Sequence, residues 1–174
     1  PLFEPITYHG VPDIRTIVYK GYPVMAMVRL PTRQSGGKAN LHQGAVGAGI
    51  DLATGRTLEG TWHDRRIGVH PDTGVSIAGR TIPDWEKLLS LAASCHELAG
   101  LGYLGVDVVL DAEQGPLMLE LNARPGLGIQ IANGIGLRVG LDAVDEALGG
   151  REPPPVEERV AFAVARFGRV PPPG

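Results

Sequence analysis

Two short segments, 106–111 and 116–122, alternate apolar residues with acids, and the second ends on an amide. Folded as an antiparallel hairpin, they would place Asp107 directly opposite Glu120, with Asn122 one step along the same side. The other side would then be entirely apolar, with the facing pairs Val106 and Leu121, Val108 and Leu119, and Leu110 and Leu117. The pattern therefore predicts a hairpin with one core-facing side and one side that could carry chemistry.

Directly opposed carboxylates destabilise a hairpin unless a cation lies between them. Two carboxylates and an amide carbonyl are hard oxygen ligands, which suit Mg²⁺. No histidine or cysteine shares this side, so a zinc site is not expected. The alternative is a solvent-exposed hairpin that carries ordinary acids. The sharp turn 123–126, with the cation Arg124 two residues after the amide, favours the metal site.

Two arginines lie on two predicted strands earlier in the chain. Residues 13–19 and 24–30 have the composition of strands, and residues 20–23 supply a turn. If the strands pair symmetrically about position 22, Arg15 faces Arg29. Facing guanidinium groups repel unless an anion lies between them, so we expect both arginines to point into a cleft with the hairpin acids and to clamp phosphate. The alternative for Arg15 is an ordinary surface residue of a strand.

The remaining elements follow from periodicity and turn residues. Pro83 and the apolar spacing after it predict a helix, and the glycine-rich stretch after the hairpin predicts a short one. The expected elements are a polar loop at 31–41, a glycine-bearing strand at 42–52, turns and short strands at 53–81, helices at 83–99, within 124–136 and at 141–148, and a helix or strand at 156–167.

Composition restricts the class of protein. The chain has 174 residues, of which 43% are hydrophobic. Its formal net charge of −3 argues against nucleic acid as the main partner. No apolar run is long enough to predict a membrane span. The single cysteine, Cys95, excludes an intramolecular disulfide and fits a reducing compartment, so a cytoplasmic location is expected.

The motifs resemble those of a known family. Gly105–Asp107 followed by Leu119–Gly126 resembles the metal-binding hairpin of ATP-grasp ligases. Asp13–Arg15, Met27–Arg29 and Asn40–Gly44 resemble the RimK-like branch, which includes the alpha-L-glutamate ligase-like proteins. The resemblance covers about residues 11–136 and implies an α+β fold, a mainly antiparallel sheet packed against helices that corresponds to the C-terminal catalytic lobe.

The resemblance also implies roles for particular residues. The implied cofactors are ATP and two Mg²⁺ ions, with Mn²⁺ as an alternative, and the implied metal ligands are Asp107, Glu120 and Asn122. Arg15 and Arg29 are the catalytic candidates, because the arginines at these positions contact phosphate or the substrate acyl group. The implied nucleotide-binding residues are Arg15, Arg29, Lys38, Asn40 and Arg124.

The implied reaction is ATP-dependent ligation of a carboxylate to an amine through an acylphosphate, with an amino acid or peptide as substrate and glutamate suspected. Homo-oligomerisation stays open. One alternative is a non-catalytic domain that keeps the fold for binding or assembly, and another is a Mg²⁺-dependent phosphohydrolase. His63, His70 and Asp72 are candidates for an acceptor site, against ordinary loop residues.

The organisation expected from this resemblance is a catalytic lobe over residues 1–150, with 53–81 as an excursion, and a Pro-rich spacer and tail over 151–174. The first ATP-grasp lobe, with its lysines and phosphate loop, has no counterpart in the sequence. We therefore expect the isolated chain to bind Mg²⁺–ATP more weakly than a two-lobed ligase, and to be inactive alone.

Overall fold

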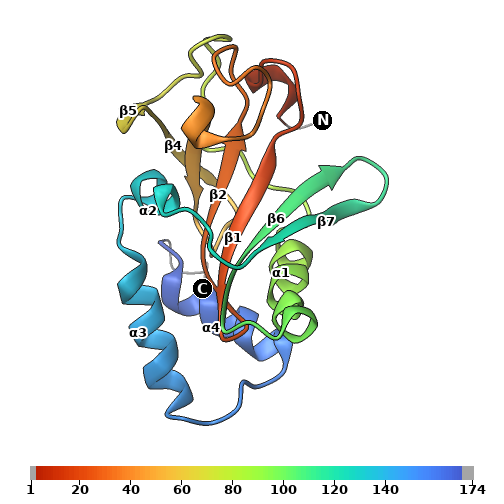
Figure 1. Ribbon diagram of the computed structural model, residues 1–174, viewed down its shortest axis with the longest axis vertical. Coiled ribbons are helices and arrows are strands. Elements are labelled where there is room, and N and C mark those ends of the chain that lie inside the picture. Colours follow the sequence, from red (N-terminus) through yellow and green to blue (C-terminus); the bar gives the residue numbers. More distant parts are fainter. Residues whose placement is uncertain (1–2, 170–174) are drawn as a thin grey trace.

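In the computed structural model, which describes residues 3–169, the strands form one antiparallel sheet in the order β5-β4-β3-β2-β1-β6-β7 (Figure 1). The strands are β1 (Asp13–Tyr19), β2 (Tyr22–Leu30), β3 (Val46–Ile50), β4 (Thr57–Trp62), β5 (Arg65–Ile67), β6 (Tyr103–Asp111) and β7 (Gly115–Asn122). The helices are α1 (Trp85–Ala99), α2 (Gly128–Asn133), α3 (Leu137–Leu148) and α4 (Val156–Phe167), with short 3₁₀ turns η1 (Glu4–Ile6) and η2 (Leu41–Gln43). The expected α+β fold is confirmed.

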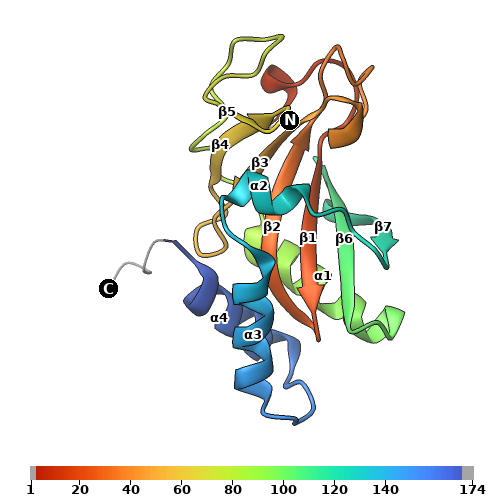
Figure 2. The ribbon, with the colours of Figure 1, turned by 60° about the vertical axis from the view of Figure 1, so that its left-hand side comes forward.

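Helices cover both faces of the sheet. Figure 2 shows α2 and α3 in front of the strands and α1 behind them, while α4 packs against α1 and β2. Alternate residues of the central strands feed two cores: Ile14 and Val28 join the core under α1, whereas Ile17 and Met27 join the core under α2 and α3. Within the described residues, no helix has both the length and the apolar character needed to span a membrane.

The turn between β1 and β2 is shorter than expected. Lys20 and Gly21 both have positive φ, 47° and 81°, which is typical of a two-residue hairpin turn, and Tyr19 pairs with Tyr22. This turn and a bulge between Ile17 and Val18 together pair Arg29 with Asp13 and Arg15 with Met27. The predicted pairing of Arg15 with Arg29 is wrong, because it assumed that the strands pair symmetrically about position 22.

The β6–β7 hairpin confirms one part of its predicted register and corrects another. Asp107 pairs with Glu120, and Val106 with Leu121, as expected. Beyond this point a bulge shifts the pairing by one residue, so Val108 faces Met118 and Leu110 faces Pro116. The predicted pairings with Leu119 and Leu117 are therefore wrong. Leu119 is the additional residue of the bulge, and it is 61% exposed instead of facing the core.

Several predicted boundaries move. The strand expected at 42–52 is restricted to β3, because residues before it form η2, where the Asn40 side chain accepts a hydrogen bond from the His42 backbone N–H. The helices expected at 83–99 and 141–148 begin at Trp85 and Leu137, and 156–167 is a helix. The predicted excursion at 53–81 contains β4 and β5. Residues 170–174 of the predicted spacer and tail, 151–174, lie outside the described residues.

Glycines of β3 let α2 approach the sheet. A Cβ atom on Gly49 would lie 2.8 Å from the backbone oxygen of Ala132 and 2.6 Å from Oδ1 of Asn133. The close approach matters for the site, because α2 follows directly on the turn after β7. Backbone cannot move away as a flexible side chain can, so only glycine fits here without a shift of the helix.

We predict that Gly49→Ala lowers the free energy of unfolding by about 1–3 kcal/mol, because the added methyl group overpacks the β3–α2 contact. The measurement is urea denaturation followed by circular dichroism. Gly68→Ala is the matched control, since a Cβ atom there meets nothing within 4 Å. Equal stability of the two variants would show that the close approach is unimportant.

Candidate active site

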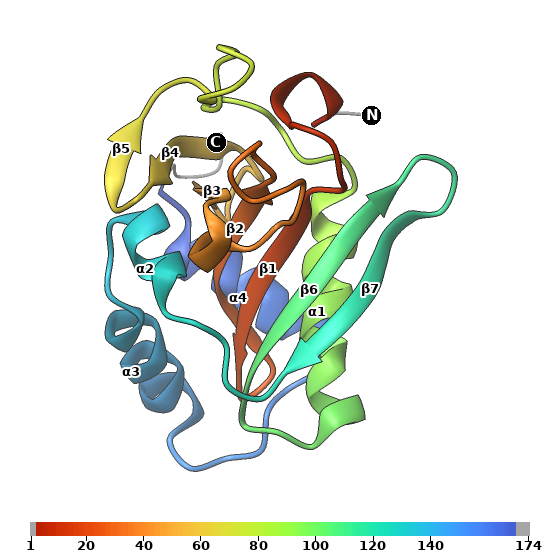
Figure 3. The same ribbon diagram turned by 45° about the horizontal axis from the view of Figure 1, so that its top comes forward.

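A cleft of about 440 Å³ lies over the half of the sheet formed by β2, β1, β6 and β7, on the face that also carries α2. These four strands form its floor, and the loop between β2 and β3 and the turn after β7 form its walls. Figure 3 shows the course of these strands in the sheet. The residues that line it include Asp13, Arg15, Arg29, Lys38, Asn40, Asp107, Glu120 and Asn122. Both arginines therefore reach the cleft of the acids, although they do not face each other.

Asp107 lies at the centre of this cleft, and its side chain is only 2% exposed. Arg15, its direct neighbour on β1, donates from Nε to Oδ1 at 2.7 Å and from an Nη atom to Oδ2 at 2.6 Å. Arg29 donates to Oδ2 at 2.8 Å, and Asn122 donates to Oδ2 at 3.2 Å. The buried carboxylate is thus compensated by two guanidinium groups.

Asp13 holds Arg29 in place with a two-pronged ion pair, in which Nε donates to Oδ1 at 2.6 Å and an Nη atom donates to Oδ2. Burial raises the pKa of Asp13, and the hydrogen bond and charge of Arg29 oppose that rise. Burial disfavours the charge of Arg29, but its bonds to Asp13 and the negative charge of Asp107 outweigh this effect and raise its pKa. Arg29 is therefore a fixed cation in the floor of the cleft.

Glu120 and Asn122 extend the polar row to the edge strand β7. Among residues 3–169, the Glu120 side chain makes no hydrogen bond or ion pair, whereas Asn122 uses its amide N–H and keeps its carbonyl oxygen free. With Asp107, these side chains supply two carboxylates and an amide oxygen, which suit Mg²⁺ in type. In the described part of the chain, no three histidine, cysteine, aspartate or glutamate side chains are grouped to hold a metal ion.

The loop between β2 and β3 brings Lys38 and Asn40 to the cleft. His70 contacts the start of this loop through a hydrogen bond, because its Nε2 lies 3.1 Å from the Pro31 backbone oxygen. Burial lowers the pKa of His70, which keeps the ring neutral, so that Nδ1 can accept a hydrogen bond from the Asp72 backbone N–H. The loop is thus held by hydrogen bonds from residues far along the chain.

Other candidate residues lie elsewhere. Arg124 is exposed and does not line the cleft. His63 contacts Gln34 at 2.9 Å, and Asp72 accepts a hydrogen bond from the backbone of Arg33, so both support the loop, as His70 does. None of the three candidates for an acceptor site lines the cleft.

The structure adds residues to which the sequence analysis gave no role. The most important is Asp13, and its alternation with Arg15 on one strand was the available signal. His42 and Met27 also line the cleft; both lie in segments that carry the family resemblance, but the sequence analysis gave them no role.

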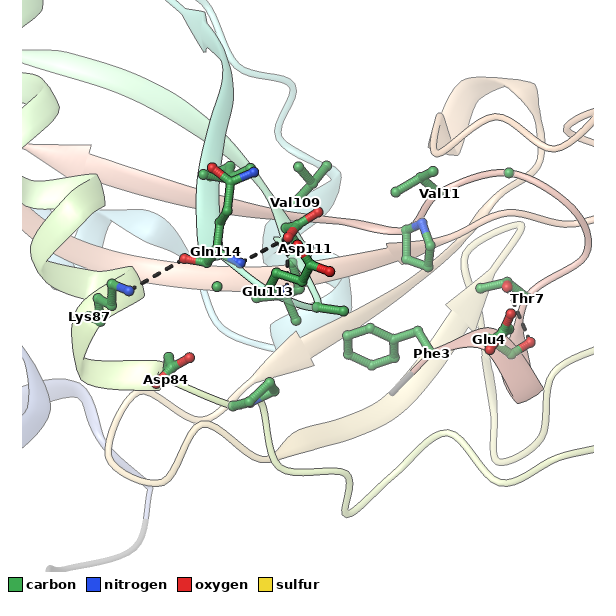
Figure 4. Close-up of a pocket in the computed structure, with 17 residues that line it drawn as sticks. Phe3, Glu4, Thr7, Val11, Asp84, Lys87, Val109, Asp111, Glu113 and Gln114 are labelled. Atoms are coloured by element: carbon green, nitrogen blue, oxygen red, sulfur yellow. Dashed lines mark hydrogen bonds between the residues drawn. The ribbon is translucent and has the colours of Figure 1, made fainter. Parts of the chain in front are cut away.

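A second cavity, of about 750 Å³, lies between the N-terminal segment, the start of α1 and the β6–β7 turn, and it shares no residue with the cleft. Figure 4 shows Lys87 of α1 donating to Gln114 in the β6–β7 turn, with Phe3 on the opposite side of the cavity. The cavity contains neither of the strand arginines nor the paired acids. The chemistry-bearing residues are therefore gathered in the smaller cleft.

Comparison with known families identifies the fold. A family model for sugar-transfer associated ATP-grasp proteins matches residues 1–146. The chain belongs to the ATP-grasp family. Its expected resemblance to RimK-like, alpha-L-glutamate ligase-like proteins is confirmed as well by two curated relatives.

Both relatives of this ATP-grasp chain bear the name "Probable alpha-L-glutamate ligase". The protein from Parasynechococcus marenigrum (strain WH8102) is 37% identical over 103 residues, which is 59% of this chain and 20% of that protein. The protein from Shewanella halifaxensis (strain HAW-EB4) is 35% identical over 86 residues, which is 48% of this chain and 18% of that protein. The chain spans about a fifth of the length of these curated relatives.

We predict that Arg29→Ala lowers the free energy of unfolding by about 3–5 kcal/mol at neutral pH, because it leaves Asp13 and Asp107 buried with less compensation. The penalty should shrink at acidic pH. A carboxyl group whose pKa is raised by folding stabilises the folded state fully below its ordinary value of 3.8, and it loses this contribution as pH rises through the raised value. Without Arg29 the pKa of Asp13 rises further, so lowering the pH stabilises the variant more than it stabilises the wild type.

Chemical denaturation at neutral and mildly acidic pH measures this effect. The control is Arg138→Ala on α3, whose arginine is 84% exposed in its pair with Asp142. It should change stability by less than about 1 kcal/mol at either pH. A penalty for Arg29→Ala that is independent of pH would contradict the role assigned to Asp13.

Proposed function

We propose that this chain is the metal- and phosphate-binding lobe of an ATP-dependent carboxylate–amine ligase, with glutamate as a substrate. One observation carries the proposal: two strand arginines, the buried Asp107 and the exposed Glu120 meet in one cleft. Membership of the ATP-grasp family and the printed names of the relatives support the reaction class.

The proposed cofactors are ATP and Mg²⁺, with Asp107, Glu120 and Asn122 as the residues that would hold the metal. Mg²⁺ supplies neutralisation of phosphate charge when it is bound. The donor set fits this ion in type, since it consists of oxygen atoms alone, and it is open on the side of Glu120.

The chain's own residues act by positioning and charge. Arg29, fixed by Asp13, presents a guanidinium group to anionic oxygens, and Lys38 and Asn40 reach the same cleft from the loop above it. In the proposed reaction a substrate carboxylate attacks the γ-phosphorus of ATP, ADP leaves, and an acylphosphate remains. An amine then attacks the acyl carbon, and phosphate leaves as the amide forms. Fixed cations beside both anionic reactants lower their mutual repulsion.

The ligase assay uses the protein that contains this sequence, with ATP, Mg²⁺ and glutamate as either the acid or the amine. We expect ADP formation to depend on both a carboxylate and an amine, and mass spectrometry to find a product heavier by one glutamyl residue. Phosphate release without an amine would contradict the ligase assignment and indicate a phosphohydrolase. Nucleotide binding without turnover would contradict it and indicate a non-catalytic binding domain.

We predict that Glu120→Gln lowers turnover in this assay on the order of 10²-fold or more, because it removes one charged metal ligand. Stability should change by less than about 0.5 kcal/mol, since the side chain is exposed and unpaired among the described residues. Glu113→Gln, in the turn of the same hairpin, is the matched control and should keep full activity. Wild-type turnover of Glu120→Gln would exclude the proposed metal site.

A further inference from the structure

Arg15 and Arg29 both pair with Asp107, but they differ in how firmly they are held. Arg29 has a second carboxylate partner in Asp13, which accepts hydrogen bonds from Nε and from an Nη atom of Arg29. Among the residues that the structure describes, Arg15 pairs with Asp107 alone. If Arg29 leaves Asp107, it keeps its ion pair with Asp13. If Arg15 leaves Asp107, it keeps no ion pair among the described residues.

The Oδ2 atom of Asp107 has no acceptor position left for a further ligand. A carboxylate offers about four lone-pair positions, two on each oxygen. Asp107 accepts one hydrogen bond at Oδ1, from Arg15, and three at Oδ2, from Arg15, Arg29 and Asn122. A cation can coordinate Oδ2, or both oxygens together, only if a donor is displaced.

The balance of charge determines which donor a cation displaces from Asp107. The two arginines balance Asp13 and Asp107, so a divalent cation added to this group creates an excess of positive charge that only Glu120 offsets. Displacement of Arg15 removes a positive charge from beside the cation and frees both oxygens of Asp107 to a large extent. Displacement of Arg29 would in addition leave Asp13 buried without a partner, which is costly.

We propose that Arg15 is a displaceable counter-ion of Asp107: it occupies the carboxylate when no metal is present, and it is released when a divalent cation binds. The inference rests on the proposed function, since it takes Asp107 as a metal ligand. The released guanidinium group stays at the cleft, where phosphate oxygens are its natural partners. Metal and phosphate then bind more strongly together than either binds alone.

The test measures binding of Mn²⁺ alone to the 174-residue chain, by the electron paramagnetic resonance signal of the free ion. Arg15→Gln should bind Mn²⁺ roughly tenfold or more tightly than the wild type, because two charge-assisted hydrogen bonds no longer compete for Asp107. Arg138→Gln, which removes an exposed arginine from another aspartate, should leave the affinity unchanged. In the double variant Arg15→Gln/Asp107→Asn the gain should disappear.

The outcomes separate the two proposals. Equal Mn²⁺ affinity of wild type and Arg15→Gln, with a loss in Glu120→Gln, would overturn the exchange of Arg15 while the metal site stands. If Glu120→Gln leaves Mn²⁺ binding unchanged in the wild type and in every Arg15 variant, the exchange of Arg15 and the proposed function are both overturned. If Arg15→Gln fails to fold by circular dichroism, Arg15→Lys takes its place. It keeps the charge but loses the fork, and a tightening smaller than tenfold in the same direction is expected.

Discussion

A buried carboxylate must be compensated, and in this chain that requirement falls on Asp107. Its partners come from three other strands, since Arg15 lies on β1, Arg29 on β2 and Asn122 on β7. Asp13 extends the group by compensating Arg29 from the opposite side. Four charged groups thus form a nearly neutral cluster in the floor of a cleft, and removal of Arg29 is costly because both of its carboxylate partners stay buried.

The surrounding fold serves this cluster through a few irregular features. The two-residue turn at Lys20 and Gly21, together with the bulge between Ile17 and Val18, sets the register that brings Asp13 beside Arg29. The bulge in β7 lies next to Glu120, whose side chain lines the cleft. Glycines in β3 and the buried His70 hold α2 and the loop after β2 against the same face. These features are local, yet together they determine which side chains can meet.

The sequence was informative where regular alternation applies. The pairing of Asp107 with Glu120 follows from period-two patterning and from one apolar side, and it was correctly predicted. The pairing of Arg15 with Arg29 failed because register depends on turn length, and two residues with positive φ in the turn leave little trace in composition. The exposed position of Leu119 failed for a related reason, since a bulge inserts one residue without altering the apolar pattern.

Buried ion pairs were the least predictable part. The sequence placed Arg15 and Arg29 near the acids, but it gave no role to Asp13, because its pairing with Arg29 depends on the register between β1 and β2, which local spacing does not give. The expectation that Arg124 contributes to nucleotide binding stays a prediction, and the structure leaves its side chain outside the cleft. Tertiary placement of long side chains depends on rotamers and on neighbouring strands, which residue types alone do not specify.

The most direct measurement is a crystal structure of the chain grown with Mn²⁺ and a non-hydrolysable ATP analogue, with anomalous scattering used to locate the metal. The account predicts an anomalous peak at Asp107, Glu120 and Asn122, with phosphate oxygens beside it and Arg29 still paired with Asp13. A nucleotide bound in the larger cavity near Phe3 and Lys87, with no metal at Asp107, would contradict it.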